Sequence, residues 1–452
     1  MAFGGSLGLV RRVTAAGLAA ALLAGIAMAA PATVPAARAA SAIVPGSVNR
    51  SSLAVEARYD VRASLRLASG SLGVDERIAI VNRDGEPIDH LELNCVLARL
   101  GSLAISGATV DGVPVRPTVS DQTIRLPLGG LLPPGGAAEV RLVFTARFGT
   151  RLDASRWLFT SYGATWAAYR WLPWVSAPRP FDRPNHGDPF VTASAPSVRL
   201  ALTTDRAAAI ATNGHRTAVI GRTQVFAATN VRDLTFVADP LFRTASAYVG
   251  DTRVVVYGRT SARRATLLRE ASRALARLEA LLGPYPWSVL TVAETAGGYA
   301  VESPGAIWIP RGAATANLPW LVAHEIAHQW FYGLVGSDQA REPFADEAPA
   351  DFLARVVSGS LRSSRCARDE LDRSIYGYSS ACYFEVVYVQ GSQVLDAIRN
   401  RVGGPAFFRA LRGYLAAHRN GFGSTAELLA ALDAVDPADL TTTLRSRFPR
   451  IL

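Results

Sequence analysis

The sequence predicts a multidomain protein of the β and α+β classes, in which an all-β N-terminal domain precedes an α+β domain that ends in helices. At 452 residues the chain is longer than one hydrophobic core usually supports. Residues 51–250 read as short alternating segments broken by Gly, Pro, Asn and Asp, a pattern typical of strands and turns. Beyond this point the apolar residues recur with helical spacing, which indicates a second domain over 251–452.

The N-terminal segment is typical of a signal peptide. Arg11 and Arg12 precede an uncharged run rich in Ala and Leu over residues 13–30. Small-x-small triplets, the kind of site at which signal peptides are cleaved, end at Ala29 and at Ala39. We favour the second triplet, because cleavage there also removes a linker-like Pro/Ala stretch. The expected boundaries are a signal peptide over 1–39 and a linker over 40–50.

This N-terminus predicts export and a secreted, extracellular protein with no stable membrane insertion after cleavage. An uncleaved membrane anchor is the alternative, and the weak apolarity of the Ala-rich run disfavours it. No cysteine lies near either cleavage site, so a lipoprotein is not expected.

Individual segments of the N-terminal domain carry the strand pattern. Residues 77–82 precede the turn signal at 83–85, and residues 139–144 form another such segment. The run 157–174 is rich in aromatic residues, and it is expected to form either core or a wall that faces the second domain.

A long helix opens the second domain. Ser261 is the expected N-cap, and Gly283 with Pro284 ends the helical pattern. A strand is expected at 288–292, another near 306–309, and helices from there to the C-terminus. The apolar positions that define the first helix are Leu267, Leu268, Ala271, Leu275, Leu278 and Leu282.

The net charge of +10 does not indicate nucleic acid as a partner. Every basic residue is Arg and none is Lys, a complete bias that codon usage explains better than a binding surface does. The chain also lacks a basic run with interleaved aromatic residues. The sequence makes no prediction of the oligomeric state.

Three cysteines occur in the chain. Cys366 and Cys382 are close in sequence and flank a polar stretch, and an exported chain can keep a disulfide, so we expect these two to be bridged. Cys95 lies in the apolar run 91–100 and is expected to be a buried, unpaired thiol.

The strongest motif is a pair of histidines, His324 and His328, with Glu325 between them. In a helix this spacing places both imidazoles on one face, where they can bind the same metal ion. Catalytic zinc usually has three protein ligands and an open position for water, and Glu347 lies nineteen residues after His328. A structural histidine pair without a metal is the alternative.

These residue types suit hydrolysis. Two neutral imidazoles and one carboxylate leave a net positive centre, which lowers the pKa of a bound water and polarises a carbonyl group. Glu325 can accept the proton of that water and pass it to a leaving amine. We therefore expect one Zn²⁺ per chain and a peptide substrate.

The same region resembles the aminopeptidase N family of gluzincin zinc metallopeptidases, whose pattern is HExxH, eighteen residues and then Glu. The chain has HEIAHQWFYGLVG followed by PFADEAPADFLA, and the family pattern is close to HELAHQWFGNLVT followed by LWLNEGFASFFA. The resemblance implies that His324, His328 and Glu347 bind zinc and that Glu325 is the general base. It also implies a β saddle or sandwich domain followed by a thermolysin-like zinc peptidase domain.

The resemblance implies roles for two further residues. Glu302 lies in a segment similar to the family's GxMEN, whose Glu binds the free α-amine of the substrate. Tyr388 lies in a segment similar to YxKG, whose Tyr stabilises the oxyanion of the tetrahedral intermediate. Glu302 can instead be an ordinary acid at a strand edge, and Tyr388 a core aromatic. The chain departs from the family pattern at Tyr299, Val301, Ser303, Asp346, Ala348, Pro349 and Gln390.

One departure tests the assignment of Glu347. A proline fits only the first turn of a helix without loss of a hydrogen bond, so Pro349 implies that the helix begins close to Glu347. If the helix starts earlier, the position of Glu347 is in doubt.

Three functions remain open at this point: an aminopeptidase, a gluzincin endopeptidase of the thermolysin kind, and a catalytically silent zinc-containing binding protein. The intact Glu325 disfavours the silent protein, because a binding protein needs no general base. Glu302 favours the aminopeptidase over the endopeptidase.

Overall fold

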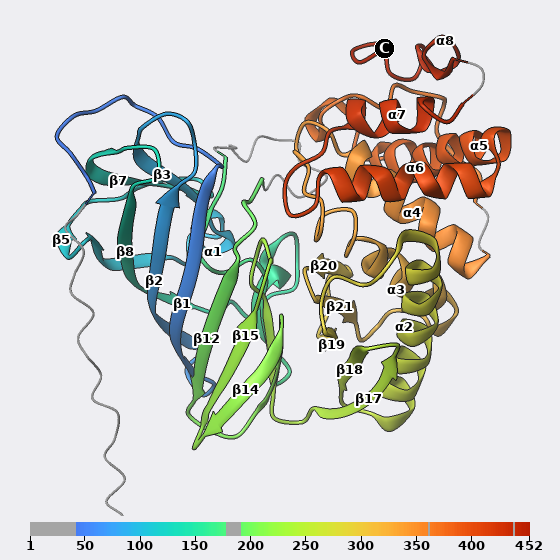
Figure 1. The fold of residues 1–452 in the computed structure, drawn as a ribbon. Helices are drawn as coiled ribbons and strands as arrows, with labels where there is room; N and C mark the ends of the chain where they lie inside the picture. The colour runs from blue at the N-terminus through green and yellow to red at the C-terminus, as the bar shows by residue number, and fades with distance from the viewer. Residues whose placement is uncertain (1–41, 178–190, 360–361, 437–438) are drawn as a thin grey trace, which may run out of the picture. The chain divides into compact units, whose positions relative to one another are not determined.

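The computed structural model describes residues 42–177, 191–359, 362–436 and 439–452. These residues belong to one compact unit. The expected signal peptide over 1–39 lies outside the described residues, as does the start of the expected linker. Figure 1 shows strands in the N-terminal part and helices at the C-terminal end, which confirms the predicted order of β and α+β structure.

Two sheets that face each other form most of the N-terminal part. Their strands are β1 (Val55–Arg66), β2 (Ser71–Asn82), β3 (Ile88–Asn94), β4 (Ala104–Val110), β5 (Val113–Pro114), β6 (Thr118–Ser120), β7 (Thr123–Leu132), β8 (Ala137–Arg147), β11 (Trp174–Val175), β12 (Ser197–Thr204), β14 (His215–Ile220) and β15 (Thr223–Ala228). The order is β14-β15-β12-β1-β2-β8-β4-β5 in the larger sheet and β11-β3-β7-β6 in the smaller. A short helix, α1 (Val96–Arg99), follows β3.

The strands of the larger sheet form because apolar and polar residues alternate along them. In β1 and β2 every second side chain is buried, and Val61 and Ile78 are fully covered. β1 pairs with β2 in antiparallel fashion and with β12 in parallel. The core of the sandwich therefore lies on one face of this sheet.

The aromatic run 157–174 contributes both to the core and to a wall toward the second part of the chain. The short helix η1 (Arg156–Leu158) lies at its start. Its strands β9 (Phe159–Tyr162) and β10 (Thr165–Ala168) join β13 (Ala209–Thr212) and β16 (Phe236–Asp239) in a sheet of order β13-β16-β10-β9. Trp171 lies in the main core. Trp157 and Tyr169 instead pack with Trp308, which belongs to the C-terminal part.

A sheet of order β17-β18-β19-β21-β20 forms the floor of the C-terminal part. Its strands are β17 (Arg243–Val249), β18 (Thr252–Gly258), β19 (Val289–Thr295), β20 (Val301–Ser303) and β21 (Ala306–Pro310). β18, β19 and β21 are parallel neighbours, whereas β17 and β20 pair in antiparallel fashion at the two edges. β17 lies before the expected boundary at 250, yet it pairs along its whole length with β18.

The long helix α2 (Ser261–Leu282) connects the parallel strands β18 and β19. Its N-cap is Thr260 and not the expected Ser261, because the Thr260 hydroxyl accepts the backbone N–H of Arg263 at 3.3 Å. The predicted apolar positions are buried except Leu268, which is partly buried, and Gly283 ends the helix with a positive φ of 97°.

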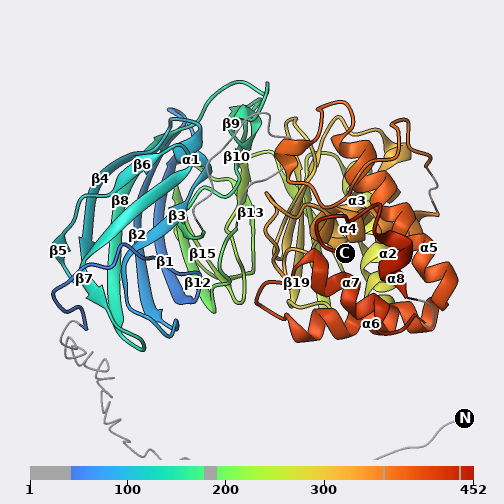
Figure 2. The same cartoon turned by 90° about the horizontal axis from the view of Figure 1, so that it is seen from above.

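The remaining helices follow in sequence to the C-terminus. They are η2 (Thr315–Asn317), α3 (Leu318–Ala327), α4 (Phe344–Ser358), η3 (Ile375–Gly377), η4 (Glu385–Gln390, a π-helical turn), α5 (Gly391–Val402), α6 (Gly404–Ala417), α7 (Thr425–Asp433) and α8 (Leu440–Leu444). α4 contacts α3, α5 and α7, and Figure 2 shows these helices grouped on one side of the strands. No helix in the described ranges is long and apolar enough to cross a membrane.

The cysteines behave as the sequence predicts. Cys366 and Cys382 form a disulfide that closes the segment between α4 and η4. Cys95 is unpaired and buried, and its thiol donates to the carbonyl oxygen of Trp171 at 3.1 Å. Burial raises the pKa of the Cys95 thiol to about 12, so it stays protonated and unreactive.

Candidate metal centre

Helix α3 brings His324 and His328 to one face, as their spacing predicts. Val322 and Ile326 of this helix are fully buried, which anchors its opposite side in the core. The helix ends at Ala327, and His328 is its C-cap, with its backbone N–H 3.3 Å from the carbonyl oxygen of His324. Both imidazoles are buried.

Helix α4 supplies Glu347 from its first turn. The helix begins at Phe344, and its N-terminal dipole favours the carboxylates of Asp346 and Glu347 there. Pro349 lies one turn further in than the sequence pattern suggested, because the helix starts earlier than expected. The proline leaves the Ala345 carbonyl without its usual helical donor, and the helix continues to Ser358 despite this loss.

The three ligand atoms form a nearly equilateral triangle. The Nε2 atoms of His324 and His328 are 3.2 Å apart, and Oε2 of Glu347 is 3.4 Å from each of them. Ligands about 2.0–2.1 Å from a tetrahedral zinc ion lie about 3.3–3.4 Å from one another. The triangle therefore has the size that zinc requires.

The donor chemistry of the triangle also fits zinc. Two imidazoles and one carboxylate are a common ligand set of catalytic zinc and leave one position open for water. Glu347 Oε2 is buried, and besides its contacts with the two histidine nitrogens it has no hydrogen-bonding partner among the described residues. Although burial raises the pKa of Glu347, the two histidines lower it overall, so the carboxylate is ionised. The residues present therefore fit one zinc ion.

Asp346 holds the second histidine. Its Oδ1 is 2.8 Å from His328 Nδ1, and its Oδ2 accepts the amide of Gln339 at 2.6 Å. Burial lowers the pKa of His328, yet Asp346 and Glu347 raise it well above its ordinary value. These carboxylates thus favour a cation at His328, either a proton or a metal ion that displaces it. Asp346 is therefore placed to orient the His328 ring.

Glu325 follows His324 on α3 and is buried beside the ligands. Burial raises its pKa well above the ordinary value, and the carboxylates of Glu302 and Glu347 raise it further, whereas His328 lowers it. Glu325 is therefore within electrostatic reach of both the ligand triangle and Glu302. A buried carboxyl group beside the ligand triangle is placed to transfer protons there.

Tyr388 reaches the site from the π-helical turn η4. Its ring lies 5.6 Å from the ring of His324 at an angle of 21°. Burial raises the pKa of the Tyr388 hydroxyl, as do the Glu347 carboxylate and Tyr383, so the hydroxyl stays a proton donor. The close approach of the chain after Tyr388 to helix α4 depends on Gly391, where a Cβ atom would lie 2.6 Å from Cβ of Ala348 on α4.

Glu302 lies on the edge strand β20 and is buried. Its carboxylate accepts a hydrogen bond from Arg170 at 3.2 Å, and its backbone carbonyl accepts the Tyr169 hydroxyl at 3.1 Å. Arg170 is itself buried and lies 3.5 Å from the carboxylate of Asp233. The N-terminal part of the chain therefore supplies a cation to the residue predicted to bind the substrate amine.

The aromatic wall continues beside Glu302. Trp157 and Tyr299 meet edge to face at 6.1 Å, and Tyr299 is largely exposed, with 77% of its surface open. Gly298 between them has a positive φ of 86°, and a Cβ there would lie 2.2 Å from the Trp157 ring. Sequence reasoning assigned no contact to Tyr169 or Arg170, although the aromatic density of 157–174 suggested a wall.

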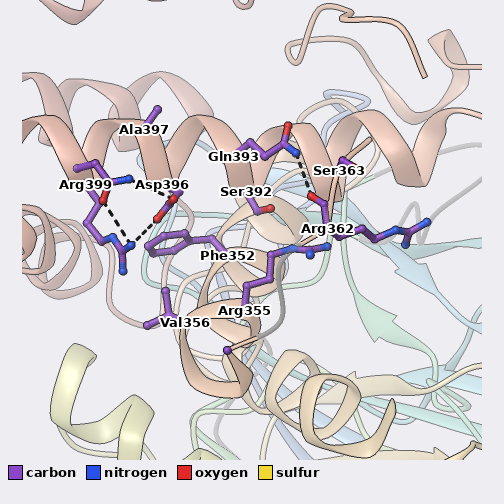
Figure 3. Close-up of a pocket in the computed structure, with 12 residues that line it drawn as sticks. Phe352, Arg355, Val356, Arg362, Ser363, Ser392, Gln393, Asp396, Ala397 and Arg399 are labelled. Atoms are coloured by element: carbon purple, nitrogen blue, oxygen red, sulfur yellow. Dashed lines mark hydrogen bonds and ion pairs between the residues drawn. The ribbon is translucent and has the colours of Figure 1, made fainter. Parts of the chain in front are cut away.

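A large cavity beside α4 is separate from the metal ligands. It has a volume of about 770 Å³ and lies between α4 and α5, with Phe352 and Val356 on its floor (Figure 3). None of the predicted site residues lines it. Its arginines are already paired with carboxylates, namely Arg355 with Asp351, Arg362 with Glu385, and Arg399 with Asp396.

The structure thus brings all the predicted site residues into one region, although their roles stay predictions. His324, His328 and Glu347 meet at the ligand triangle, and this is the group able to hold a metal ion within the residues that the structure describes. Gln329, next to His328, links the segment after Glu302 to the turn that follows α3, because its side chain bonds to the backbone of Ser303 and Gly305.

Comparison with solved structures identifies the class of fold. An M1 zinc metallopeptidase from Deinococcus radiodurans is 22% identical, covers 90% of this chain and 95% of its own, and has a TM-score of 0.67. A mutant of such an enzyme bound to a Tyr-Ser-Ala substrate is 22% identical, covers 91% and 98%, and has a TM-score of 0.68. At this level of identity the likeness shows that the fold is the same. The predicted fold class is confirmed.

Particular proteins match in sequence over shorter stretches. Tricorn protease-interacting factor F2 of Thermoplasma acidophilum is 28% identical over 171 residues, which are 33% of this chain and 21% of that protein. The factor of the same name from Thermoplasma volcanium is 27% identical over 169 residues, which are 32% and 21%. The match spans about a fifth of these curated relatives. No family model matches the sequence.

Proposed function

We propose that this protein is a zinc-dependent metallopeptidase that hydrolyses peptide bonds. The observation that carries the proposal is the triangle of His324, His328 and Glu347, whose edges of 3.2 and 3.4 Å fit tetrahedral zinc. The M1 zinc metallopeptidases with the same fold support the same interpretation.

The protein's own groups supply the proton transfers. Bound zinc lowers the pKa of a water ligand and polarises the scissile carbonyl. Glu325 takes the proton of the attacking water and passes it to the leaving amine. The Glu325 carboxylate therefore ends the reaction in the protonation state in which it began. Tyr388 donates its hydroxyl hydrogen to the oxyanion, because its raised pKa keeps it protonated.

The preferred substrate within this function is a peptide with a free N-terminus. Glu302 is buried at the edge strand β20 and is within electrostatic reach of Glu325. An ammonium group paired with Glu302 would align the first peptide bond with the general base. This assignment makes the protein an aminopeptidase.

An endopeptidase is the second candidate, and Arg170 favours it. The guanidinium of Arg170 lies 3.2 Å from the Glu302 carboxylate and takes up part of its charge. A carboxylate that is already paired attracts an ammonium group less strongly. Internal cleavage then needs no free amine.

We also propose that the protein is exported and secreted. The signal-peptide pattern over 1–39 supports this location, and a disulfide between Cys366 and Cys382 suits an oxidising compartment. Mass spectrometry of the protein from culture supernatant should find Ala40 at its N-terminus. A chain that remains in the cell pellet with residues 1–39 attached would contradict export.

The decisive experiment compares metal content and peptide cleavage in three proteins. The wild type should hold one zinc per chain and cleave peptides in a digest read by mass spectrometry. Glu325→Gln should keep the zinc and lose activity by about 10²–10⁴-fold, because only the proton carrier is removed. Glu347→Ala should lose both zinc and activity. Retention of a full zinc equivalent by Glu347→Ala would show that another residue is the third ligand.

A further inference from the structure

The two histidine ligands are held in different ways. His328 Nδ1 lies 2.8 Å from the carboxylate of Asp346, the usual arrangement for a metal-binding histidine. His324 Nδ1 is buried and has no hydrogen-bonding partner among the described residues. Another contact must therefore fix the orientation of the His324 ring.

Two aromatic rings lie nearly parallel to the His324 imidazole. Trp320, one helical turn earlier on α3, has its ring centroid 5.4 Å away at an angle of 28°. Tyr388 lies 5.6 Å away at 21°. Stacked rings of this kind restrict rotation of the imidazole, because rotation would drive its edge into their faces.

Trp320 is itself fixed by a buried ion pair. Its indole N–H donates to Oδ1 of Asp351 at 3.0 Å. Asp351 is fully buried and also accepts two hydrogen bonds from Arg355, at 2.5 and 3.2 Å. Asp351 therefore has both a charge partner and a third donor, which makes its position and that of the indole well defined.

These contacts follow one face of helix α4. Glu347, Asp351 and Arg355 are spaced four residues apart, so they lie one above another along the helix. Figure 3 shows Arg355, the last residue of this row, together with Phe352 and Val356 of the same helix. The same helix thus carries the third metal ligand and, one turn later, the anchor for the residue that stacks on the first ligand.

We propose that Trp320 is a positioning residue for the metal centre. Trp320 holds His324 by stacking in place of a hydrogen bond, and Asp351 and Arg355 fix the indole of Trp320. This inference rests on the proposed zinc site. Trp320 is only half-buried, so its burial in the core contributes less than that of the fully covered aromatics. The hydrogen bond between the Trp320 indole and Asp351 is consequently better explained by the histidine that Trp320 orients.

Zinc affinity and coordination geometry test the proposal directly. Metal-free variants are titrated with zinc against a chelator of known affinity, and with Co²⁺ to record the visible absorption of the metal centre. Trp320→Leu should raise the zinc dissociation constant about tenfold to a hundredfold and alter the Co²⁺ spectrum. Trp320→Phe keeps a ring to stack and should stay within about threefold of the wild type. Asp351→Asn keeps an acceptor for the indole but loses the ion pair with Arg355, so a weakening of a few fold is expected.

A matched control separates positioning from general loss of packing. Phe408→Ala removes a buried ring on α6 that packs against Phe352 and Phe407, away from the histidines. It should lower the melting temperature of the metal-free protein and leave the zinc dissociation constant unchanged. If Trp320→Leu does not fold by circular dichroism, the Co²⁺ spectra of Asp351→Asn and Trp320→Phe decide.

Three outcomes would overturn the proposal. One is wild-type zinc affinity and an unchanged Co²⁺ spectrum in folded Trp320→Leu. Another is a loss of affinity in Trp320→Phe as large as in Trp320→Leu, because stacking would then not be the cause. A wild-type protein that binds no zinc would overturn both this inference and the proposed function, whereas the first two outcomes leave the proposed function intact.

Discussion

Glu76 in the β-sandwich and Asp346 beside the metal centre are both fully buried carboxyl groups, and they differ in every polar contact. Asp346 pairs with His328 and accepts the amide of Gln339. Neither oxygen of Glu76 has a hydrogen-bonding partner among the described residues. Burial raises the pKa of Glu76 well above its ordinary value, so this group is neutral where an unpaired charge would be costly.

The comparison shows two ways in which a buried acid is tolerated. Near the metal centre the carboxyl group of Asp346 lies between His328 and Gln339, and its hydrogen bonds with both fix its position beside the metal ligand. In the sandwich the carboxyl group of Glu76 is neutral, and it is a buried polar side chain without a hydrogen-bonding partner among the described residues. The first kind should matter for function and the second for stability, and three substitutions test this division.

The largest effect is expected at Asp346. Asp346→Ala removes the acceptor that orients His328 and should weaken zinc binding by about tenfold to a hundredfold. Asp346→Asn keeps an oxygen acceptor and should lose much less. Chelator competition with the purified variants measures both constants. Equal zinc affinities in Asp346→Ala and the wild type would mean that the buried carboxyl group of Asp346 does not orient His328 for metal binding.

A smaller effect is expected at Glu302, whose charge Arg170 partly offsets. Glu302→Gln should lower cleavage of a free peptide by about tenfold, because one charge-assisted hydrogen bond to the ammonium is lost. The N-acetylated form of the same peptide should be a poor substrate for both proteins. Mass spectrometry of timed digests gives the rates. Equal internal cleavage of both peptides, unaffected by the mutation, would favour the endopeptidase instead.

The smallest effect is expected at Glu76, and it has the opposite sign. Glu76→Leu should stabilise the fold at pH 7.5 by about 1 kcal/mol, because it replaces an unpaired polar group by an apolar one. Urea unfolding of each protein, compared with the exposed control Glu139→Leu on β8, measures the difference. Destabilisation by Glu76→Leu at this pH would mean that the carboxyl has a partner worth keeping.

The pH dependence of the Glu76 effect follows from its raised pKa. A group whose folded pKa lies above its unfolded value near 4.5 contributes stability below pH 4.5 and loses it as the pH rises through the folded value. The advantage of Glu76→Leu over the wild type should therefore shrink when unfolding is repeated at pH 5. An advantage that grows toward acidic pH would contradict neutral Glu76.

The ligand triangle could be predicted because its information is local. His324, Glu325 and His328 lie within one helical turn, and Glu347 lies in the first turn of α4, the next α-helix in sequence. The disulfide and the buried Cys95 could be predicted for similar reasons, since polar and apolar surroundings are visible in short stretches. Local periodicity also indicated α2 and the strand-rich first part.

Contacts between distant parts of the chain could not be predicted in this way. Arg170 lies 132 residues from Glu302 in the sequence. Its backbone also adopts a positive φ of 41°, which the sequence does not indicate because the residue is not a glycine. The edge strand β17 falls before the expected domain boundary because it pairs with a strand that follows it. For Trp320 the spacing to His324 was present in the sequence, but its anchor, Asp351, becomes visible only when α3 and α4 pack together.

Gly391 leads to a consequence for how this centre can vary. The hydrogen in place of its side chain lets the start of α5 touch Ala348 on α4, and η4 with Tyr388 is carried along. The separation between these two backbones thus depends on the absence of a Cβ atom at Gly391. If a Cβ atom were present, no rotamer change elsewhere could restore this separation. A methyl group at this position would act as a spacer that moves the phenol away from the ligands without altering any polar residue. At Gly404, where a Cβ atom would meet nothing within 4 Å, the same methyl group has room.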